Sequence, residues 1–175
     1  MIDNNVEEIK EHLEAIMSIL GIERTESNKN TPLRVAKMYC NELFKNRNLT
    51  NKEELDSQIK IFNRKDIAEA MPVAVKNIAF SSTCEHHWLP FMGTVDISYI
   101  PNDLIIGLSK LPRVVKYFSQ MPQLQERLTC QIGEYLVSVL APKSLSVKIT
   151  AVHCCVKCRG IENDCTTETF YDYNS

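Results

Sequence analysis

The sequence lacks several features, and each absence excludes a class of protein. No apolar run approaches the roughly eighteen residues that a membrane-spanning helix needs. The chain has 20 Lys and Arg against 22 Asp and Glu, so it lacks the basic excess that binding to a nucleic-acid backbone usually requires. Its first residues lack the basic and apolar sequence of a signal peptide. We therefore expect a cytoplasmic protein whose partners are neither nucleic acid nor membrane.

Cysteine, in contrast, is well represented. There are seven cysteines, an odd number, and in a chain without a secretion signal we expect them to be reduced thiols that serve a metal. The 175 residues, 44% of them hydrophobic, are enough for one domain with its own core and a short helical extension. No internal repeat or low-complexity tract interrupts this composition.

The first part of the chain predicts helices. Apolar residues recur at helical spacing over residues 6–20. Thr31 as N-cap and Pro32 as the first helical residue predict a second helix. Residues 45–69 are polar and irregular, and we expect a connector with one short helix there. Residues 1–70 are therefore predicted to form an N-terminal helical segment.

Residues 71–175 predict an α+β domain. Strand patterns cover four stretches, at residues 72–80, 94–99, 146–152 and 166–171. Between the second and third stretches, helical spacing predicts two helices, one capped by Ser109 and one that starts at the break at residues 120–122. This order of elements favours an antiparallel sheet with helices on one side.

Two segments hold most of the metal-binding side chains. Thr83–His87 supplies a thiol, a carboxylate and two imidazoles, and His153–Cys158 supplies an imidazole and three thiols. We interpret them as two halves of one site, because a zinc ion takes thiolates and imidazoles at such spacings. One interpretation closes a four-ligand shell and makes the zinc purely structural; its ligands are Cys84, His87, Cys155 and Cys158.

The alternative is a catalytic zinc, which keeps one coordination position for water. His86 and His153 favour it, because each lies beside a presumed ligand without being needed as one, and imidazole exchanges protons near neutral pH. Glu85 either orients one of these imidazoles or is simply solvated.

Cationic residues suggest an anionic substrate. Lys110 and Arg113 lie at the start of a predicted helix, and Lys157 and Arg159 adjoin the second half of the metal site. Any one of them alone is best interpreted as a solvated charge. The pair Gln125–Glu126 opens the next helix, where the helix dipole by itself accounts for a glutamate.

The chain also resembles a known family. Four ordered stretches and one helix start are similar to the signatures of GTP cyclohydrolase I, and the resemblance runs from about residue 31 to residue 170. The stretches are Ser82–His87, Gly107–Lys110, Gln125–Thr129, and His153–Cys155 followed by Arg159 and Gly160, and the helix start is Thr31–Met38.

This resemblance implies a tunnelling fold, in which sheets from several subunits join into a barrel. It also implies a homodecamer of two pentameric rings that face each other. The implied reaction converts GTP to 7,8-dihydroneopterin triphosphate and formate, the first step toward folates and related pterins.

The resemblance further implies roles for the metal-site residues. Cys84, His87 and Cys155 would hold Zn²⁺, with water in the fourth position. The water would add to C8 of guanine. His86 and His153 would move protons to and from the nitrogens of the opening imidazole ring.

Other residues are implied to bind the substrate. Glu126, with Gln125 near it, would bind the guanine edge, and Ser109 would act at the ribose. The residues that would receive the triphosphate, some of them from a neighbouring subunit, are Lys110, Arg113 and Arg159.

The chain departs from the family pattern at Cys154 and Cys158, which add thiols beside the metal. The family has no ligand at the position of Cys158, which speaks against the closed four-ligand shell. Two alternatives remain at this stage. One is a tunnelling-fold relative that acts on another purine or pterin, and the other is a non-catalytic oligomer with structural zinc.

Overall fold

The computed structural model describes residues 4–48, 52–64 and 71–175. The chain divides into two compact units, Met1–Lys45 and Asn46–Ser175. The N-terminal unit consists of α1 (Asn4–Ile19), α2 (Thr31–Met38) and a short π-helix (Tyr39–Leu43). Its small core contains Val6, Ala36 and Cys40, against which Ile9, Leu13 and Leu33 pack.

The ends of these helices follow known capping rules, with one correction. Gly21 has φ of +68° and ends α1, because its N–H bonds to Ser18 and the N–H of Ile22 bonds to Met17. The prediction of Thr31 as N-cap is wrong by one residue: Thr31 is already helical, and Asn30 is the N-cap. Pro32 remains in the first turn, where the missing N–H costs nothing.

The second unit is built on a five-stranded sheet with the order β5-β2-β3-β6-β7. Four of its strands pair antiparallel: β2 (Val73–Cys84), β3 (Pro90–Ile100), β6 (Ser144–His153) and β7 (Thr167–Asn174). The short β5 (Pro122–Gln123) lies parallel to β2. The four predicted strands are thus confirmed, and the second unit is α+β.

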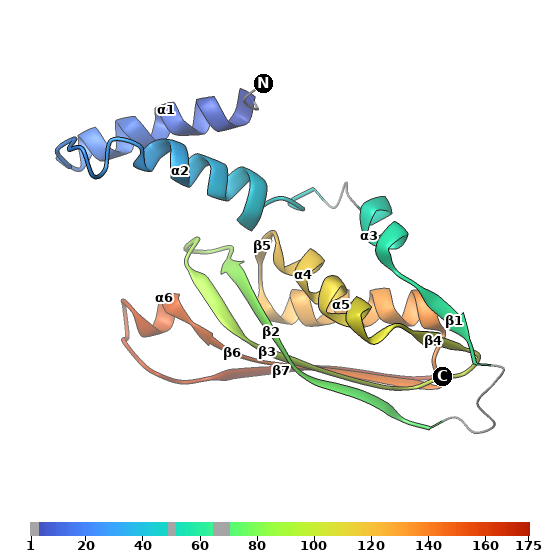
Figure 1. The fold of residues 1–175 in the computed structure, drawn as a ribbon. Helices are drawn as coiled ribbons and strands as arrows, with labels where there is room; N and C mark the ends of the chain where they lie inside the picture. The colour runs from blue at the N-terminus through green and yellow to red at the C-terminus, as the bar shows by residue number, and fades with distance from the viewer. Residues whose placement is uncertain (1–3, 49–51, 65–70) are drawn as a thin grey trace. The chain divides into compact units, whose positions relative to one another are not determined.

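Helices α4 (Leu111–Ser119) and α5 (Gln125–Leu140) lie on one side of this sheet (Figure 1). The start of each helix differs from the prediction. Ser109 does not cap α4, because the chain enters through a 3-10 turn (Leu108–Lys110) in which the carbonyl of Gly107 accepts from Lys110. The next helix begins only at Gln125, because Pro122 and Gln123 pair with β2.

The segment before residue 71 belongs in part to this second unit. α3 (Lys52–Gln58) confirms the expected short helix, and β1 (Ile61–Asn63) pairs with β4 (Leu104–Ile106). Leu55 of α3 is only 3% exposed and joins the main core. The boundary between units therefore falls at Lys45/Asn46, earlier than residue 70. Residues 49–51 and 65–69 of the predicted connector lie outside the described residues.

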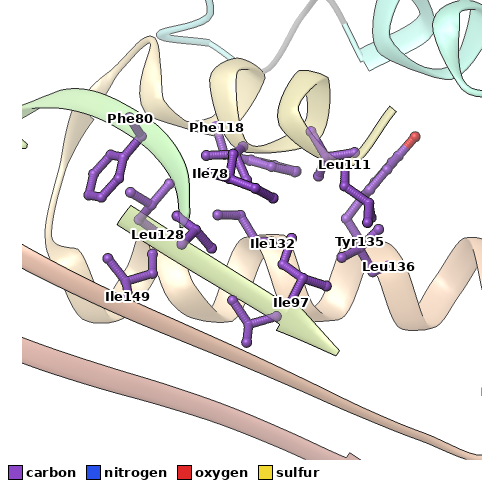
Figure 2. Close-up of a cluster of buried hydrophobic side chains, with 14 of the residues drawn as sticks. Ile78, Phe80, Ile97, Leu111, Phe118, Leu128, Ile132, Tyr135, Leu136 and Ile149 are labelled. Carbon is purple, nitrogen blue, oxygen red and sulfur yellow. The ribbon is translucent and has the colours of Figure 1, made fainter. Parts of the chain in front are cut away.

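The main core fills the space between the two helices and the sheet (Figure 2). Strands β3 and β6 bury every second side chain, as their alternating sequences predict. Helix α5 packs on β6 and β7, and α4 packs on β2. The fully buried side chains of α5 include Leu128, Ile132 and Leu136. The packing of the two helices on the sheet positions the ends of the strands.

Helix length and hydropathy bear on the membrane prediction. Among the described residues, we find no helix with the length and apolar character required to cross a bilayer.

Candidate metal centre

The sheet brings the two halves of the predicted site together. β2 and β6 flank β3 and both run antiparallel to it, so they end at the same edge of the sheet. At this edge Thr83 is paired with Pro90, and the neighbouring Phe91 is paired with His153. Cys84 ends β2, and Cys155 lies in α6 (Cys154–Lys157), directly after β6. Cys84 and Cys155 are 71 positions apart in the sequence, and they come close because β3 pairs with both β2 and β6.

Three side chains of this edge form a compact donor group. The Sγ atom of Cys84 lies 3.9 Å from Nδ1 of His87 and 3.9 Å from Sγ of Cys155. All three donor atoms lie within 4.8 Å of one another. Two sulfurs bound to one zinc at about 2.3 Å in a tetrahedral arrangement would be separated by about 3.8 Å. The group therefore fits a tetrahedral metal ion, and the cysteines are too far apart for a disulfide.

A tight turn places His87 back over Cys84. The N–H of Trp88 bonds to the carbonyl of Cys84 at 2.9 Å, and the N–H of Cys84 bonds to the carbonyl of Leu89 at 2.8 Å. Trp88 has φ of +53°, a left-handed conformation that closes the turn. Cys84 is 5% exposed, whereas His87 is exposed. The donor group thus has a buried side and an open side.

Cys158 lies outside this donor group. Its N–H bonds to the carbonyl of Cys154 in α6, and its side chain hydrogen-bonds with that of Cys154. It is exposed. The group therefore has three protein donors, the number typical of catalytic rather than structural zinc sites.

The close approach of the two thiols affects the protonation of Cys155. Burial raises the pKa of the Cys155 thiol, and its hydrogen bond with Cys84 raises it further, while Arg159 lowers it. Two close thiols would repel each other as thiolates. A divalent ion reverses this preference because it binds the deprotonated sulfurs. The pair is thus suited to a metal.

His153 lies beside this group with a fixed ring. The ring stacks on Phe91, with centroids 4.6 Å apart and planes 2° from parallel. Its Nε2 atom lies 2.8 Å from Oε1 of Gln125. Burial lowers the pKa of His153, and the carboxylate of Glu126 opposes that shift. Burial thus favours the neutral imidazole.

His86 and Glu85 occupy the turn between Cys84 and His87. His86 is exposed, with its ring centroid 6.2 Å from that of His87 and nearly perpendicular to it. Glu85 pairs with Arg127 at 2.5 Å. Arg127 also donates to the carbonyl of Pro122. The carboxylate of Glu85 therefore anchors the turn to α5, and the alternative that it orients an imidazole is not what the structure shows.

The residues predicted to bind the substrate fall into two groups. Glu126, exposed in the first turn of α5, and Arg159, exposed just after α6, lie at the same edge as the donor group. Gln125 also lies there, but it is only 2% exposed. Its amide is occupied by other residues of the chain.

Ser109, Lys110 and Arg113 are not brought to this edge. They follow β4, which lies at the opposite end of the sheet from α6 (Figure 1). Only the far end of α4 approaches the metal edge, where Ser82 donates to the carbonyl of Ser119. Leu111 to Ser119 spans about 12 Å at the rise of an α-helix. Within one chain, the two groups of predicted site residues are therefore separate.

The sequence motifs missed three residues that shape the site. Phe91 holds the ring of His153, and Arg127 holds Glu85. Thr169 of β7 contacts the amide of Gln125. Arg127 lies within Gln125–Thr129, one of the stretches that resemble the family, but nothing in that stretch indicates that Arg127 pairs with Glu85. The register of β3 against β6 would have identified Phe91, since it lies opposite His153.

Comparisons with known proteins agree with the motifs. A sequence model of the family described as GTP cyclohydrolase I matches residues 9–173. The chain is 42% identical over 168 residues to the GTP cyclohydrolase 1 of Pectobacterium carotovorum subsp. carotovorum (strain PC1), covering 95% of this chain and 74% of that protein. It is 43% identical over 162 residues to the GTP cyclohydrolase 1 of Serratia proteamaculans (strain 568), covering 92% and 71%.

Among solved structures, an archaeosine synthase QueF-Like in the apo form matches with a TM-score of 0.49 and 16% identity. That match covers 62% of this chain and 97% of the other. The family match at residues 9–173 includes both halves of the metal centre.

Proposed function

The chain belongs to the GTP cyclohydrolase I family, and from this membership we propose that it converts GTP to 7,8-dihydroneopterin triphosphate and formate. The observation that carries the proposal is the three-donor group beside His153, His86 and Glu126. A purely structural metal site would need neither the open side nor two additional imidazoles.

We propose that Cys84, His87 and Cys155 hold Zn²⁺. Two thiolates and one imidazole are ligands that zinc prefers, and their spacing fits its tetrahedral geometry. When bound, the ion supplies Lewis acidity and a water acidified enough to attack C8 of guanine near neutral pH. The burial of Cys84 on one side and the exposure of His87 on the other leave the approach open to a ligand.

The histidines would handle the protons of the ring opening. His153, held against Phe91, has a pKa that burial lowers, and it can take up or donate a proton at a fixed point. His86 is exposed on the turn and can exchange its proton with solvent. Glu126 faces the same space and would accept hydrogen bonds from the guanine edge.

The triphosphate site is proposed to form between subunits. Lys110, Arg113 and Ser109 lie at the far end of the same chain, so they would complete the site of a neighbour, beside its Arg159. Cationic side chains of this kind bind phosphate oxygens through charge-assisted hydrogen bonds. In the described part of the chain β7 pairs only with β6, so its other edge is available to another sheet.

This arrangement supports the homo-oligomer that the family resemblance implies. We propose a barrel closed by several subunits, in a decamer of two pentameric rings. Light scattering on the purified protein would then give about 200 kDa, ten times the 20.0 kDa of one chain. A monomer at micromolar concentration would contradict the shared site.

The direct test of the activity is incubation of the purified, zinc-loaded protein with GTP. Mass spectrometry should show 7,8-dihydroneopterin triphosphate together with one formate for each GTP consumed. Chelation should abolish product formation and leave the oligomer assembled. An intact GTP pool, with zinc bound and the oligomer formed, would support the structural-zinc alternative. Turnover of a different purine or pterin would support a related enzyme of the same fold.

A further inference from the structure

The amide of Gln125 is the centre of a buried hydrogen-bond network. Its Nε2 atom lies 3.2 Å from the carbonyl oxygen of Ile149, 3.0 Å from that of Thr167 and 3.1 Å from Oγ1 of Thr169. Its Oε1 atom lies 2.8 Å from Nε2 of His153. The side chain has therefore no unused hydrogen-bonding atom to offer a substrate.

Two threonines determine which way this amide points. Thr129 donates its hydroxyl hydrogen to the backbone carbonyl of Gln125, at 2.8 Å. Its oxygen lies 2.6 Å from Oγ1 of Thr169, and because the hydrogen of Thr129 is already used, Thr169 must be the donor in that contact. Thr169 is then left as an acceptor toward Gln125. The group of Gln125 that faces it must be the NH₂ group.

The two carbonyls lead to the same orientation independently. Ile149 and Thr167 present oxygens that only accept, so an amide turned the other way would place Oε1 against two acceptors. Both arguments leave Oε1 facing His153. A carbonyl oxygen only accepts, so Nε2 of His153 must carry a hydrogen.

The hydrogen on Nε2 determines which tautomer the neutral ring of His153 adopts. When the ring is neutral, the hydrogen is on Nε2 and the lone pair is on Nδ1; when the ring is charged, both nitrogens carry hydrogen. Only Nδ1 changes between these states. Within the described residues the ring of His153 makes no second hydrogen bond. Stacking on Phe91, which is 0% exposed, fixes the plane in which Nδ1 points.

We propose that Gln125 is a positioning residue that holds the neutral ring of His153 as the Nε2–H tautomer, so that the lone pair of the ring lies on Nδ1. The expectation that Gln125 binds the guanine edge is replaced by this role, and the guanine contact is left to Glu126. The statement about catalysis rests on the proposed function, whereas the statement about the tautomer does not.

The tautomer can be measured without substrate. The protein, loaded with zinc and labelled with ¹⁵N,¹³C-histidine, is studied by magic-angle-spinning NMR, which separates protonated from unprotonated ring nitrogens. Only four histidines contribute, and a His153→Asn variant identifies the signal. In the wild type, the neutral ring of His153 should carry its hydrogen on Nε2 and none on Nδ1. A neutral form protonated on Nδ1 would overturn the proposal, and this measurement needs no variant of Gln125.

The variant Gln125→Met removes the acceptor and keeps the volume. Signal from the Nδ1–H tautomer should then appear for His153. The kcat for GTP should fall about ten- to a hundredfold, the usual effect of losing a residue that orients a functional histidine. The KM should stay within about twofold, because ground-state binding is retained. A rise in KM with kcat unchanged would overturn the proposal and assign Gln125 to the substrate.

Gln123→Met is the matched control. Gln123 is also a buried glutamine, 1% exposed. It donates to the carbonyl of Phe118 and to Gln131 and accepts from Arg127, without touching His153. Its loss should affect stability to a similar degree and leave the tautomer of His153 unchanged. If it shifts the tautomer as Gln125→Met does, general loosening is the cause and the proposal fails. If His153 has the expected tautomer but GTP is not turned over, only the proposed function is contradicted.

Discussion

The two ends of the catalytic unit differ in how complete they are. At the end of β2 and β6, the donor group, His153 and the turn of Glu85 are all held by contacts within the same chain. At the end of β4, Ser109, Lys110 and Arg113 surround no comparable donor group among the residues that the structure describes. A metal half-site at one end and polar residues without a metal-binding group at the other are the arrangement expected when a site forms between identical subunits.

The largest effect is expected at the end that holds the metal half-site. Cys155→Ser should abolish zinc binding and lower turnover of GTP by on the order of a thousandfold or more, because the metal's chemistry is lost with it. Elemental analysis and the product assay measure both.

Cys158→Ser is its control, since Cys158 lies three residues away in the chain but outside the donor group. Zinc content and activity should both be retained. If instead Cys158→Ser empties the site, the three-donor interpretation is wrong.

The second prediction tests whether the two ends meet in the assembly. Cys155→Ser subunits and Lys110→Ala/Arg113→Ala subunits should each be nearly inactive alone. After dissociation and reassembly as an equal mixture, about a quarter of the sites should combine two intact halves, if subunits mix at random. Recovery of activity near that fraction supports a shared site. No recovery in confirmed mixed oligomers would place both halves in one chain.

The third prediction concerns the open end alone. Lys110→Ala should raise the KM for GTP about ten- to a hundredfold, because the loss of one charge-assisted hydrogen bond to phosphate weakens binding by about that factor. The zinc content should stay constant. Lys116 is an exposed lysine of α4, the helix that follows Lys110, and Lys116→Ala should leave KM near the wild-type value. Equal effects of the two variants would indicate a general electrostatic field rather than a binding site.

The smallest effect is expected for a structural contact remote from the metal. Tyr135 of α5 donates to Asp56 of α3 at 2.8 Å, and Tyr135→Phe should lower the free energy of unfolding by about 1 kcal/mol. Urea unfolding measures this loss. Zinc content should not change, because the contact does not involve the donor group. A loss of zinc would show that the two ends are coupled through α5.

The same contact predicts a pH dependence. Burial raises the pKa of Tyr135, and the hydrogen bond to Asp56 raises it further. Below about pH 10 the tyrosine is neutral in both states, and its contribution is fully present. As pH rises above this value the unfolded chain ionises first, so stability falls. The wild type should therefore lose stability at high pH more steeply than Tyr135→Phe.

Much of this fold follows from local patterns. Alternation in residues 94–99 and 146–152 predicted strands with one buried face, and those faces are buried in β3 and β6. Gly21 and Pro32 mark helix ends for reasons of backbone geometry. The prediction that Ser109 caps α4 was wrong. A serine suits an N-cap, but here the backbone carbonyl of Gly107 accepts from the N–H of Lys110 and forms a 3-10 turn.

The site was predictable in part. Cys84 and His87 are close in sequence, so a single turn is enough to join them, and the spacing itself was informative. The family resemblance placed Gln125 near the guanine edge, whereas the sequence itself shows that an amide is present but not which partners it has. Those partners come from β6 and β7, more than twenty residues away.

The sequence by itself determined the ligand types, the strand and helix patterns and, through its motifs, the family. These depend on side-chain chemistry and short-range geometry, which any stretch of the chain carries with it. Only the tertiary structure decided that Cys155 meets Cys84, that Cys158 does not, and that Gln125 faces His153. Strand register and helix packing place these atoms, and both result from burying one common core.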